Sequence, residues 1–125
     1  MIDTPAAVDV RTVAGRFTLV LHGEFDVATV DVLDQALRGV GARRPALVTV
    51  DLRDAAFFGL TALDTVLAAH AELAARGCVL ELVNTTWSVG KMLAALNVQH
   101  LVSAGDPALL LGACAKEANV VAPTS

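Results

Sequence analysis

Few side chains in this sequence combine the type and the spacing that catalysis requires. A catalytic site needs a nucleophile with a base, a pair of carboxylates or a cluster of metal ligands. The histidines His22, His70 and His100 are scattered, and neither Cys78 nor Cys114 belongs to a CxxC pattern. Because free cysteine is usually buried, we expect both to be small core residues, and we expect His70 to be hydrogen-bonded within a helix. The sequence therefore predicts a protein that is not an enzyme.

An acidic pair, Glu24 and Asp26, follows Gly23 at the end of a predicted strand. Two carboxylates without further ligands make a weak metal site, whereas Asp26 or Thr29 is well placed to cap the next helix. The sequence contains neither the GxxxxGK-S/T loop nor the GxGxxG loop that bind phosphates. We therefore expect a turn with a helix cap here, and no metal and no cofactor.

Thr61 occupies the most informative position. Apolar residues at helical spacing predict a helix over 61–76 that ends at Gly77. A phosphate on a hydroxyl at its start would meet free backbone N–H groups and the positive end of the helix dipole. Thr61 with Asp64 also fits a capping box, in which the hydroxyl only starts the helix, and the two interpretations are compatible. The predicted buried stripe is Leu63, Val66, Leu67, His70, Leu73 and Ala74, and the opposite, solvent-facing side is Thr61, Asp64, Thr65, Ala68, Glu72 and Arg76.

The segment before this helix, Phe57-Phe58-Gly59-Leu60, is apolar where turns are usually polar. We expect Phe57 or Phe58 to anchor the segment in the core. Leu60, beside a glycine, is expected either to be buried as well or to contact a partner. The turn Phe57–Ala62 and the start of the following helix are therefore the predicted working surface of the domain.

Strand and helix patterns alternate along the chain and predict the fold. Alternating apolar and polar residues predict an opening hairpin, and a β-branched, apolar run predicts a central strand. The predicted strands cover 8–13, 16–23, 46–52, 78–83 and 99–102, and the predicted helices cover 30–40, 61–76, 89–96 and 107–118. The order β-β-α-β-α-β-α-β-α predicts an α/β domain with a mixed, mostly parallel sheet of four to five strands and about four helices.

Length, charge and hydropathy limit the function further. At 125 residues the chain fits one domain, with a core over about 8–118 and a frayed tail over 119–125. The formal charge is −4 and no basic run extends beyond Arg43-Arg44, so we expect no nucleic-acid partner. No apolar run approaches the roughly 18 residues of a membrane span, and the N-terminus lacks a signal-peptide pattern. The sequence predicts a cytoplasmic, bacterial protein without membrane insertion, and leaves open whether it is a monomer or a weak dimer.

Four segments together resemble the STAS domain family. Gly23–Thr29 looks like the family's G-E-L/F-D-x-x-T/N turn, and Leu47–Leu52 looks like its central strand ending in D-L. Phe57–Leu63 stands where the family has F-I/L-D-S-S/T-G-L, and Leu80–Asn84 with the helix after it completes the series. The resemblance extends from about Val8 to Val102. The best-studied bacterial members of this family are anti-sigma-factor antagonists.

The resemblance implies a regulatory cycle. The unmodified antagonist would bind an anti-sigma factor, often a GHKL-type serine-threonine kinase, and so release a sigma factor for transcription. The kinase would phosphorylate the second hydroxyl of the family motif, which maps onto Thr61, and a phosphatase would reset the switch. The implied partner-binding residues are Glu24, Asp26, Thr29, Phe58, Gly59, Leu60, Thr61, Asp64 and Thr65.

Three positions depart from the family pattern, with Gly59 in place of Asp, Leu60 in place of the first Ser and Ala62 in place of Gly. Asp64, one turn after Thr61, would also repel a phosphate. The sequence therefore leaves open an antagonist switched at Thr61 or a phosphorylation-independent STAS subunit of another assembly, transport-associated or stressosome-like. A nucleotide-binding protein is a further class, which the missing phosphate loop disfavours.

Overall fold

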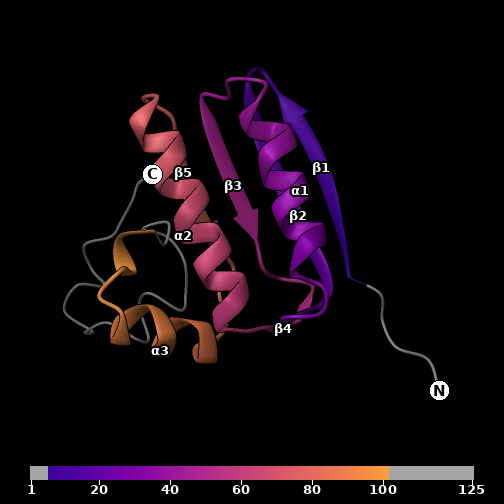
Figure 1. The fold of residues 1–125 in the computed structure, drawn as a ribbon, viewed down its shortest axis with the longest axis vertical. Coiled ribbons are helices and arrows are strands. Elements are labelled where there is room, and N and C mark those ends of the chain that lie inside the picture. The colour runs from indigo at the N-terminus through magenta and orange to yellow at the C-terminus, as the bar shows by residue number, and fades with distance from the viewer. Residues whose placement is uncertain (1–5, 102–125) are drawn as a thin grey trace.

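Strands and helices alternate along the chain largely as the hydropathy pattern predicts. The computed structural model describes residues 6–101, and these form a sheet with helices packed against it (Figure 1). The strands are β1 (Ala7–Val13), β2 (Arg16–Phe25), β3 (Leu47–Asp51), β4 (Ala55–Phe58) and β5 (Val79–Val83). The helices are α1 (Val30–Gly41), α2 (Leu60–Ala75) and α3 (Trp87–Ala95), followed by a 3₁₀ turn, η1 (Gln99–Leu101).

The sheet is mixed and mostly parallel, as predicted. β1 is antiparallel to β2, and the hairpin turns through Ala14 and Gly15, whose φ angles are 52° and 81°. β3 lies between β2 and β5 and is parallel to both, so the strand predicted to be central is central. β4 pairs in parallel with the last residues of β2. β2, β3, β4 and β5 therefore all finish at one end of the sheet, which we call the carboxyl end.

The hydrophobic core lies between the sheet and helices α1 and α2, which run side by side across it (Figure 1). Every second residue of the inner strands points into this layer, and the helices add residues three and four apart. Full burial of one such side chain contributes roughly 1.5–3 kcal/mol, so packing rather than helix propensity fixes the helices. The buried set includes Phe17, Leu19 and Leu21 of β2, Val48 and Val50 of β3, Leu33, Leu37 and Val40 of α1, and Leu63, Val66 and Leu73 of α2.

Helix α2 begins one residue before its predicted start, and the predicted capping box of Thr61 and Asp64 is wrong. Gly59 is the N-cap residue, with φ −89° and ψ −176°, and no side chain caps the first turn. The N–H of Leu63 donates to the Gly59 carbonyl at 3.0 Å, so the helix is already established before Thr61. Of the rest of the predicted stripe, Val66 and Leu73 are buried, Leu67 and His70 are half-buried and Ala74 is exposed.

Two further elements differ from their prediction. The segment 53–60, predicted as a turn, contains β4, because its middle residues align with the end of β2. The strand predicted over 99–102 is the turn η1, in which the N–H of Leu101 bonds locally to the Val98 carbonyl at 3.1 Å. The predicted last helix, Cys114 and the predicted tail lie outside the described residues. None of the helices within 6–101 has the length and apolarity to cross a membrane.

Cys78, His70 and His22 each lie next to the core or to another side chain of the domain. Cys78 is half-buried against the core, in line with its predicted role as a small packing residue. The prediction for His70 is wrong, because its buried Nδ1 has no hydrogen-bond partner among the described residues. The His70 ring instead lies 5.7 Å from the His100 ring, centroid to centroid. Nδ1 of His22 lies 3.7 Å from the carboxylate of Asp54.

Candidate functional site

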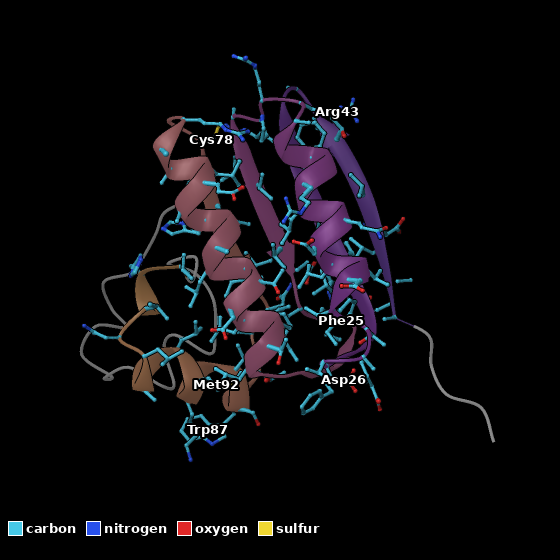
Figure 2. The ribbon with its side chains drawn as sticks, viewed as in Figure 1. Phe25, Asp26, Arg43, Cys78, Trp87 and Met92 are labelled. Atoms are coloured by element: carbon cyan, nitrogen blue, oxygen red, sulfur yellow. The ribbon has the colours of Figure 1, made fainter. Side chains whose placement is uncertain are left out.

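The two segments predicted to bind a partner meet at the carboxyl end of the sheet. Phe25, the last residue of β2, pairs with Phe58, the last residue of β4. The N–H of Gly59 donates to the Phe25 carbonyl at 3.1 Å. The turn after β2 and the start of α2 are therefore joined by main-chain contacts, and labelled Phe25 and Asp26 lie at this end of the molecule (Figure 2).

Asp26 and Thr29 are bonded to each other and to the backbone of their own turn. The Asp26 carboxylate accepts from the N–H groups of Ala28 at 2.9 Å and Thr29 at 3.2 Å. The Thr29 hydroxyl donates to the Glu24 carbonyl at 2.7 Å and accepts from the Asp26 N–H at 3.0 Å. We call this set of bonds the Asp26–Thr29 lock. It shapes the turn before α1, so the predicted turn is confirmed. Thr29 is the N-cap residue of α1, but its side chain makes no capping hydrogen bond, so the predicted cap by Asp26 or Thr29 is wrong.

Glu24 is the member of the acidic pair that remains on the surface. It is exposed, and its ladder partner across β2 and β4 is Phe57. Asp26 is half-buried and held in the Asp26–Thr29 lock. Within the described part of the chain, no three His, Cys, Asp or Glu side chains come together as metal ligands. At this turn Glu24 is therefore exposed on the surface, while Asp26 holds the backbone of the turn in place.

The apolar segment before α2 divides between the core and the surface. Phe58 is only 6% exposed and packs in the core, so the expectation that one phenylalanine anchors the segment holds for Phe58. Its side chain is consequently withdrawn from the surface on which a partner would bind. Phe57 and Leu60 are 51% and 55% exposed. Alternation along β4 explains the opposite fates of the two phenylalanines.

The Phe57 ring lies over the glycine at position 59. A Cβ atom added at Gly59 would lie 2.8 Å from Cε2 and 3.1 Å from Cζ of Phe57. The φ angle of Gly59 is −89°, which any residue can adopt, so backbone conformation does not require glycine here. Because Phe57 is half exposed, a larger residue at position 59 would displace the tip of its ring.

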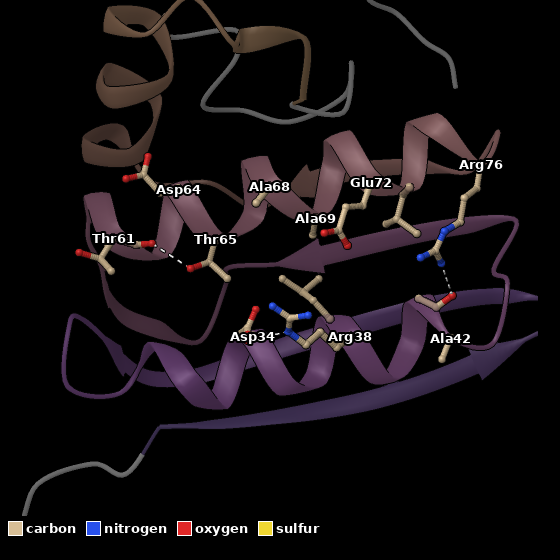
Figure 3. A pocket seen from close by; sticks show the side chains of 13 residues that line it. Asp34, Arg38, Ala42, Thr61, Asp64, Thr65, Ala68, Ala69, Glu72 and Arg76 are labelled. Carbon is tan, nitrogen blue, oxygen red and sulfur yellow. Dashed lines mark hydrogen bonds and ion pairs between the residues drawn. The ribbon is translucent and has the colours of Figure 1, made fainter.

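Thr61 is half-buried at one end of a groove between α1 and α2 (Figure 3). The groove has a volume of about 420 Å³. Its α2 side is formed by Thr61, Asp64, Thr65, Ala68, Glu72 and Arg76, which the sequence predicted to face solvent, together with Ala69 and Leu73. Asp64, Ala68, Glu72 and Arg76 on this side are exposed, as predicted, whereas Thr61 and Thr65 are half-buried where the groove faces α1. The Thr65 hydroxyl donates to the Thr61 carbonyl at 3.1 Å.

Both arginines that line the groove are already bonded (Figure 3). Arg38 Nε lies 2.9 Å from the Asp34 carboxylate, and this hydrogen bond, with the charge of Asp34, raises the pKa of Arg38 above its usual value. Arg76 donates to the Gly41 carbonyl at 3.1 Å and so ties the end of α2 to the end of α1. A negative group in the groove would have to compete with the Asp34 carboxylate for Arg38 and with the Gly41 carbonyl for Arg76.

Asp51 joins the ends of β3 and β5 close to the working surface. Its buried carboxylate accepts from the Asn84 amide at 2.9 Å, and from the N–H and guanidinium of Arg53 at 2.9 Å and 3.2 Å. Burial alone would raise the pKa of Asp51, but the hydrogen bonds from Asn84 and Arg53 outweigh it and hold this pKa below its usual value. The sequence reasoning gave Asp51 no role, although an acid directly after an apolar strand is the signal for one.

Helix α3 brings a further aromatic side chain to the carboxyl end, and sequence reasoning did not single it out. Thr86 caps the helix by accepting from the N–H of Val89 at 3.2 Å. Trp87, the first residue of α3, is 57% exposed and points away from the core (Figure 2). The Lys91 ammonium lies 5.9 Å from its ring centroid. A tryptophan outside the apolar stripe of its helix is the signal that could have identified it.

A small hollow separates β4 from α3. Its volume is about 220 Å³. Phe57 lines one side, and Thr86 and Ser88, which flank Trp87 in the sequence, line the other. The carboxyl end thus carries exposed apolar side chains from four segments, namely Val27, Phe57, Leu60 and Trp87, which we call the apolar patch.

Comparisons with solved structures find the same fold. An anti-sigma factor antagonist from Mycobacterium paratuberculosis has a TM-score of 0.70 and 21% identity, over 78% of this chain and 82% of that chain. The anti-sigma factor antagonist SpoIIAA of Bacillus, in its unphosphorylated form, has a TM-score of 0.69 and 17% identity, over 78% of this chain and 86% of that chain. Part of the murine anion transporter Slc26a9 has a TM-score of 0.61 and 14% identity, over 90% of this chain but 22% of that chain.

Sequence comparison identifies the family. A search of the curated proteins finds no match. The family model described as "Mlab, STAS domain" matches residues 8–103, which include every helix and strand of the described structure except the first residue of β1. The match contains both the turn that holds the Asp26–Thr29 lock and the start of α2. The chain belongs to the STAS domain family.

Proposed function

We propose that this protein is an anti-sigma-factor antagonist, which binds an anti-sigma factor in the cytoplasm and so releases a sigma factor. The observation that carries the proposal is the bond from the Gly59 N–H to the Phe25 carbonyl, which unites the two family segments into one surface. Exposed Glu24 and Leu60 lie on either side of this junction. The similarity to two antagonist structures also supports it. The chain acts here as a ligand, and not as a catalyst.

The proposal extends to a switch at Thr61, operated by an anti-sigma factor that is a GHKL-type kinase and reset by a phosphatase. Thr61 is the second residue of α2, and no side chain caps this helix, so its first backbone N–H groups remain available to a phosphate. A phosphate would add a charge of about −1.5 to −2 beside the contact surface. Exposed Asp64 and the Arg38–Asp34 pair make this position less favourable for the added charge.

A second candidate function is a phosphorylation-independent STAS subunit of another assembly, transport-associated or stressosome-like. The observation that favours it is the apolar surface beside Thr61, because Phe57 and Leu60 are both about half exposed. A contact made mainly through such side chains would need no phosphate switch. The two candidates share the binding surface and differ in partner and in regulation.

Binding experiments separate these candidates. The purified chain would be titrated by calorimetry with each anti-sigma factor and each STAS-associated transporter subunit of the source organism. Micromolar or tighter binding of an anti-sigma factor is expected, with Thr61→Glu weakening it by charge repulsion at the contact. Binding of a transporter subunit alone would favour the second candidate.

A kinase assay tests the switch. The partner kinase, with ATP, should add one phosphate to the wild-type chain and none to Thr61→Ala, measured by intact mass. Thr65→Ala is the matched control, because it removes a hydroxyl one turn further along the same groove. Persistence of the added mass in Thr61→Ala would exclude Thr61 as the acceptor.

A further inference from the structure

The apolar patch consists of large apolar side chains that are exposed to solvent. Phe57, Leu60 and Trp87 are 51%, 55% and 57% exposed, and Val27 is 75% exposed. They come from β4, α2, α3 and the turn after β2, four segments that meet at the carboxyl end of the sheet. Single exposed apolar residues are common, but several gathered from separate segments mark an interaction site.

The fold holds the aromatic part of this patch at the surface. Phe57 lies over Gly59, where a Cβ would come within 2.8 Å of its ring. Trp87 is the first residue of a helix that Thr86 caps, so its backbone position is fixed. Aromatic side chains have only two rotatable side-chain bonds and so lose little conformational entropy on binding, and tryptophan is enriched at binding hot spots.

The size of the hollow between β4 and α3 limits what can bind beside Phe57. Its volume of about 220 Å³ is below the roughly 300–1,000 Å³ typical of small-molecule sites. Phe57 lines one side of the hollow, and the hydroxyl residues Thr86 and Ser88 line its α3 side. Trp87 lies between these two residues in the sequence. A hollow of this size and lining suits one apolar side chain inserted from another protein.

The charges around the patch select the kind of partner. Glu24 is exposed and is the ladder partner of Phe57. Asp64 is exposed and stands four residues after Leu60 on α2, so the two side chains share one helix face. Lys91, whose ammonium lies 5.9 Å from the Trp87 ring, is a positive charge on the α3 side of the patch. On the Phe57 and Leu60 side, Glu24 and Asp64 would repel an anionic lipid surface and attract basic side chains. Charge complementarity therefore favours a protein surface with an apolar centre and basic residues around it.

We propose that Phe57 and Trp87 are the aromatic anchors of the interface, and that an apolar side chain of the partner enters the hollow between β4 and α3 beside Phe57. The partner residues around that side chain are basic and face Glu24 and Asp64. This inference rests on the proposed function and deepens it, because it adds α3 to the binding surface and specifies the chemistry of the anti-sigma factor's contact region.

The single tryptophan makes the test direct. The chain contains one tryptophan, so 5-fluorotryptophan labelling gives one ¹⁹F signal, from Trp87. Titration with the anti-sigma factor should shift or broaden that signal. Trp87→Ala and Phe57→Ala should each raise the dissociation constant about tenfold or more, as expected for hot-spot aromatics. Glu24→Lys should also raise it, and the wild-type affinity should fall as NaCl increases.

Val79→Ala is the matched control. Val79 is 54% exposed, like the anchors, but it begins β5 and so lies at the opposite end of the sheet. Its substitution should leave the dissociation constant within about twofold, and circular dichroism should show all variants folded.

The outcomes distinguish the inference from the proposed function. Binding of the anti-sigma factor with an unchanged ¹⁹F signal, and with wild-type affinity in Trp87→Ala and Phe57→Ala, would overturn the anchors and leave the antagonist function standing. No binding by the wild-type chain would overturn the function and the inference together. An affinity that rises with NaCl, or on Glu24→Lys, would refute the basic character of the partner surface.

Discussion

Replacing Thr29 with valine tests whether the shape of the β2–α1 turn depends on the Asp26–Thr29 lock. The valine side chain has the same shape but loses a 2.7 Å bond to the Glu24 carbonyl and a 3.0 Å bond from the Asp26 N–H. Each intramolecular hydrogen bond contributes about 0.5–1.5 kcal/mol, so the free energy of unfolding should fall by roughly 1–3 kcal/mol. For a domain of this size, that corresponds to a melting temperature lower by roughly 4–12 °C.

Urea denaturation followed by circular dichroism and by Trp87 fluorescence would measure the loss. Thr65→Val is the matched control, because the Thr65 hydroxyl donates to the Thr61 carbonyl, which already has its helical bond. That variant should lose no more than about 0.5 kcal/mol. If Thr29→Val proves as stable as Thr65→Val, the lock does not hold the turn, and Asp26 and Thr29 become free to act as direct partner contacts.

Three other predictions address the groups that support the working surface. Because the folded-state pKa of Asp51 is lowered, its contribution is present above the unfolded-state pKa of about 3.9 and is lost as the pH falls from there through the lower folded-state pKa; Asp51→Asn should flatten the acid limb of stability measured in urea. Gly59→Ala should displace the Phe57 ring, and a double-mutant cycle with Phe57→Ala should give a coupling of about 0.5–1.5 kcal/mol. Leu33→Ala, at a fully buried position, should cost about 2–5 kcal/mol in the same denaturation assay.

Elements with strong local periodicity could be predicted from the sequence. α1 buries Leu33, Leu37 and Val40 at the spacing that predicted it, and β3 is central as its apolar, β-branched run indicated. Gly77, with φ of 82°, ends α2 as expected. In each case the deciding information lies within a few residues of the element, so no distant contact was needed.

Features that depend on distant residues were missed or misassigned. β4 forms because Phe58 aligns with Phe25, more than thirty residues earlier, and its short sequence alone resembled a turn. The capping box failed for the same reason, since the bond from Gly59 to Phe25 fixes where α2 begins. Helical phase correctly placed Asp64, Ala68, Glu72 and Arg76 in solvent, but it could not reveal that α1 lies across a groove from this side of α2.

The candidate site was predicted in position but not in detail. The sequence placed the turn 24–29 beside the start of α2, and the structure brings them together. It could not show that Asp26 and Thr29 bond to each other, or that Trp87 from α3 reaches the same end. At Gly59, where the family pattern has Asp, the sequence also could not show that the Phe57 ring lies over the position.

The main-chain bond between Gly59 and Phe25 has a consequence for the kinetics of association. It makes the β2–α1 turn and the start of α2 one rigid body, so the backbone of the surface is already in place before a partner arrives. Ordering then costs only about 0.5–1.5 kcal/mol for each mobile side chain, such as Leu60. An encounter between such prearranged surfaces needs no slow rearrangement, so differences in affinity among partners should reside mainly in how long the complex lasts.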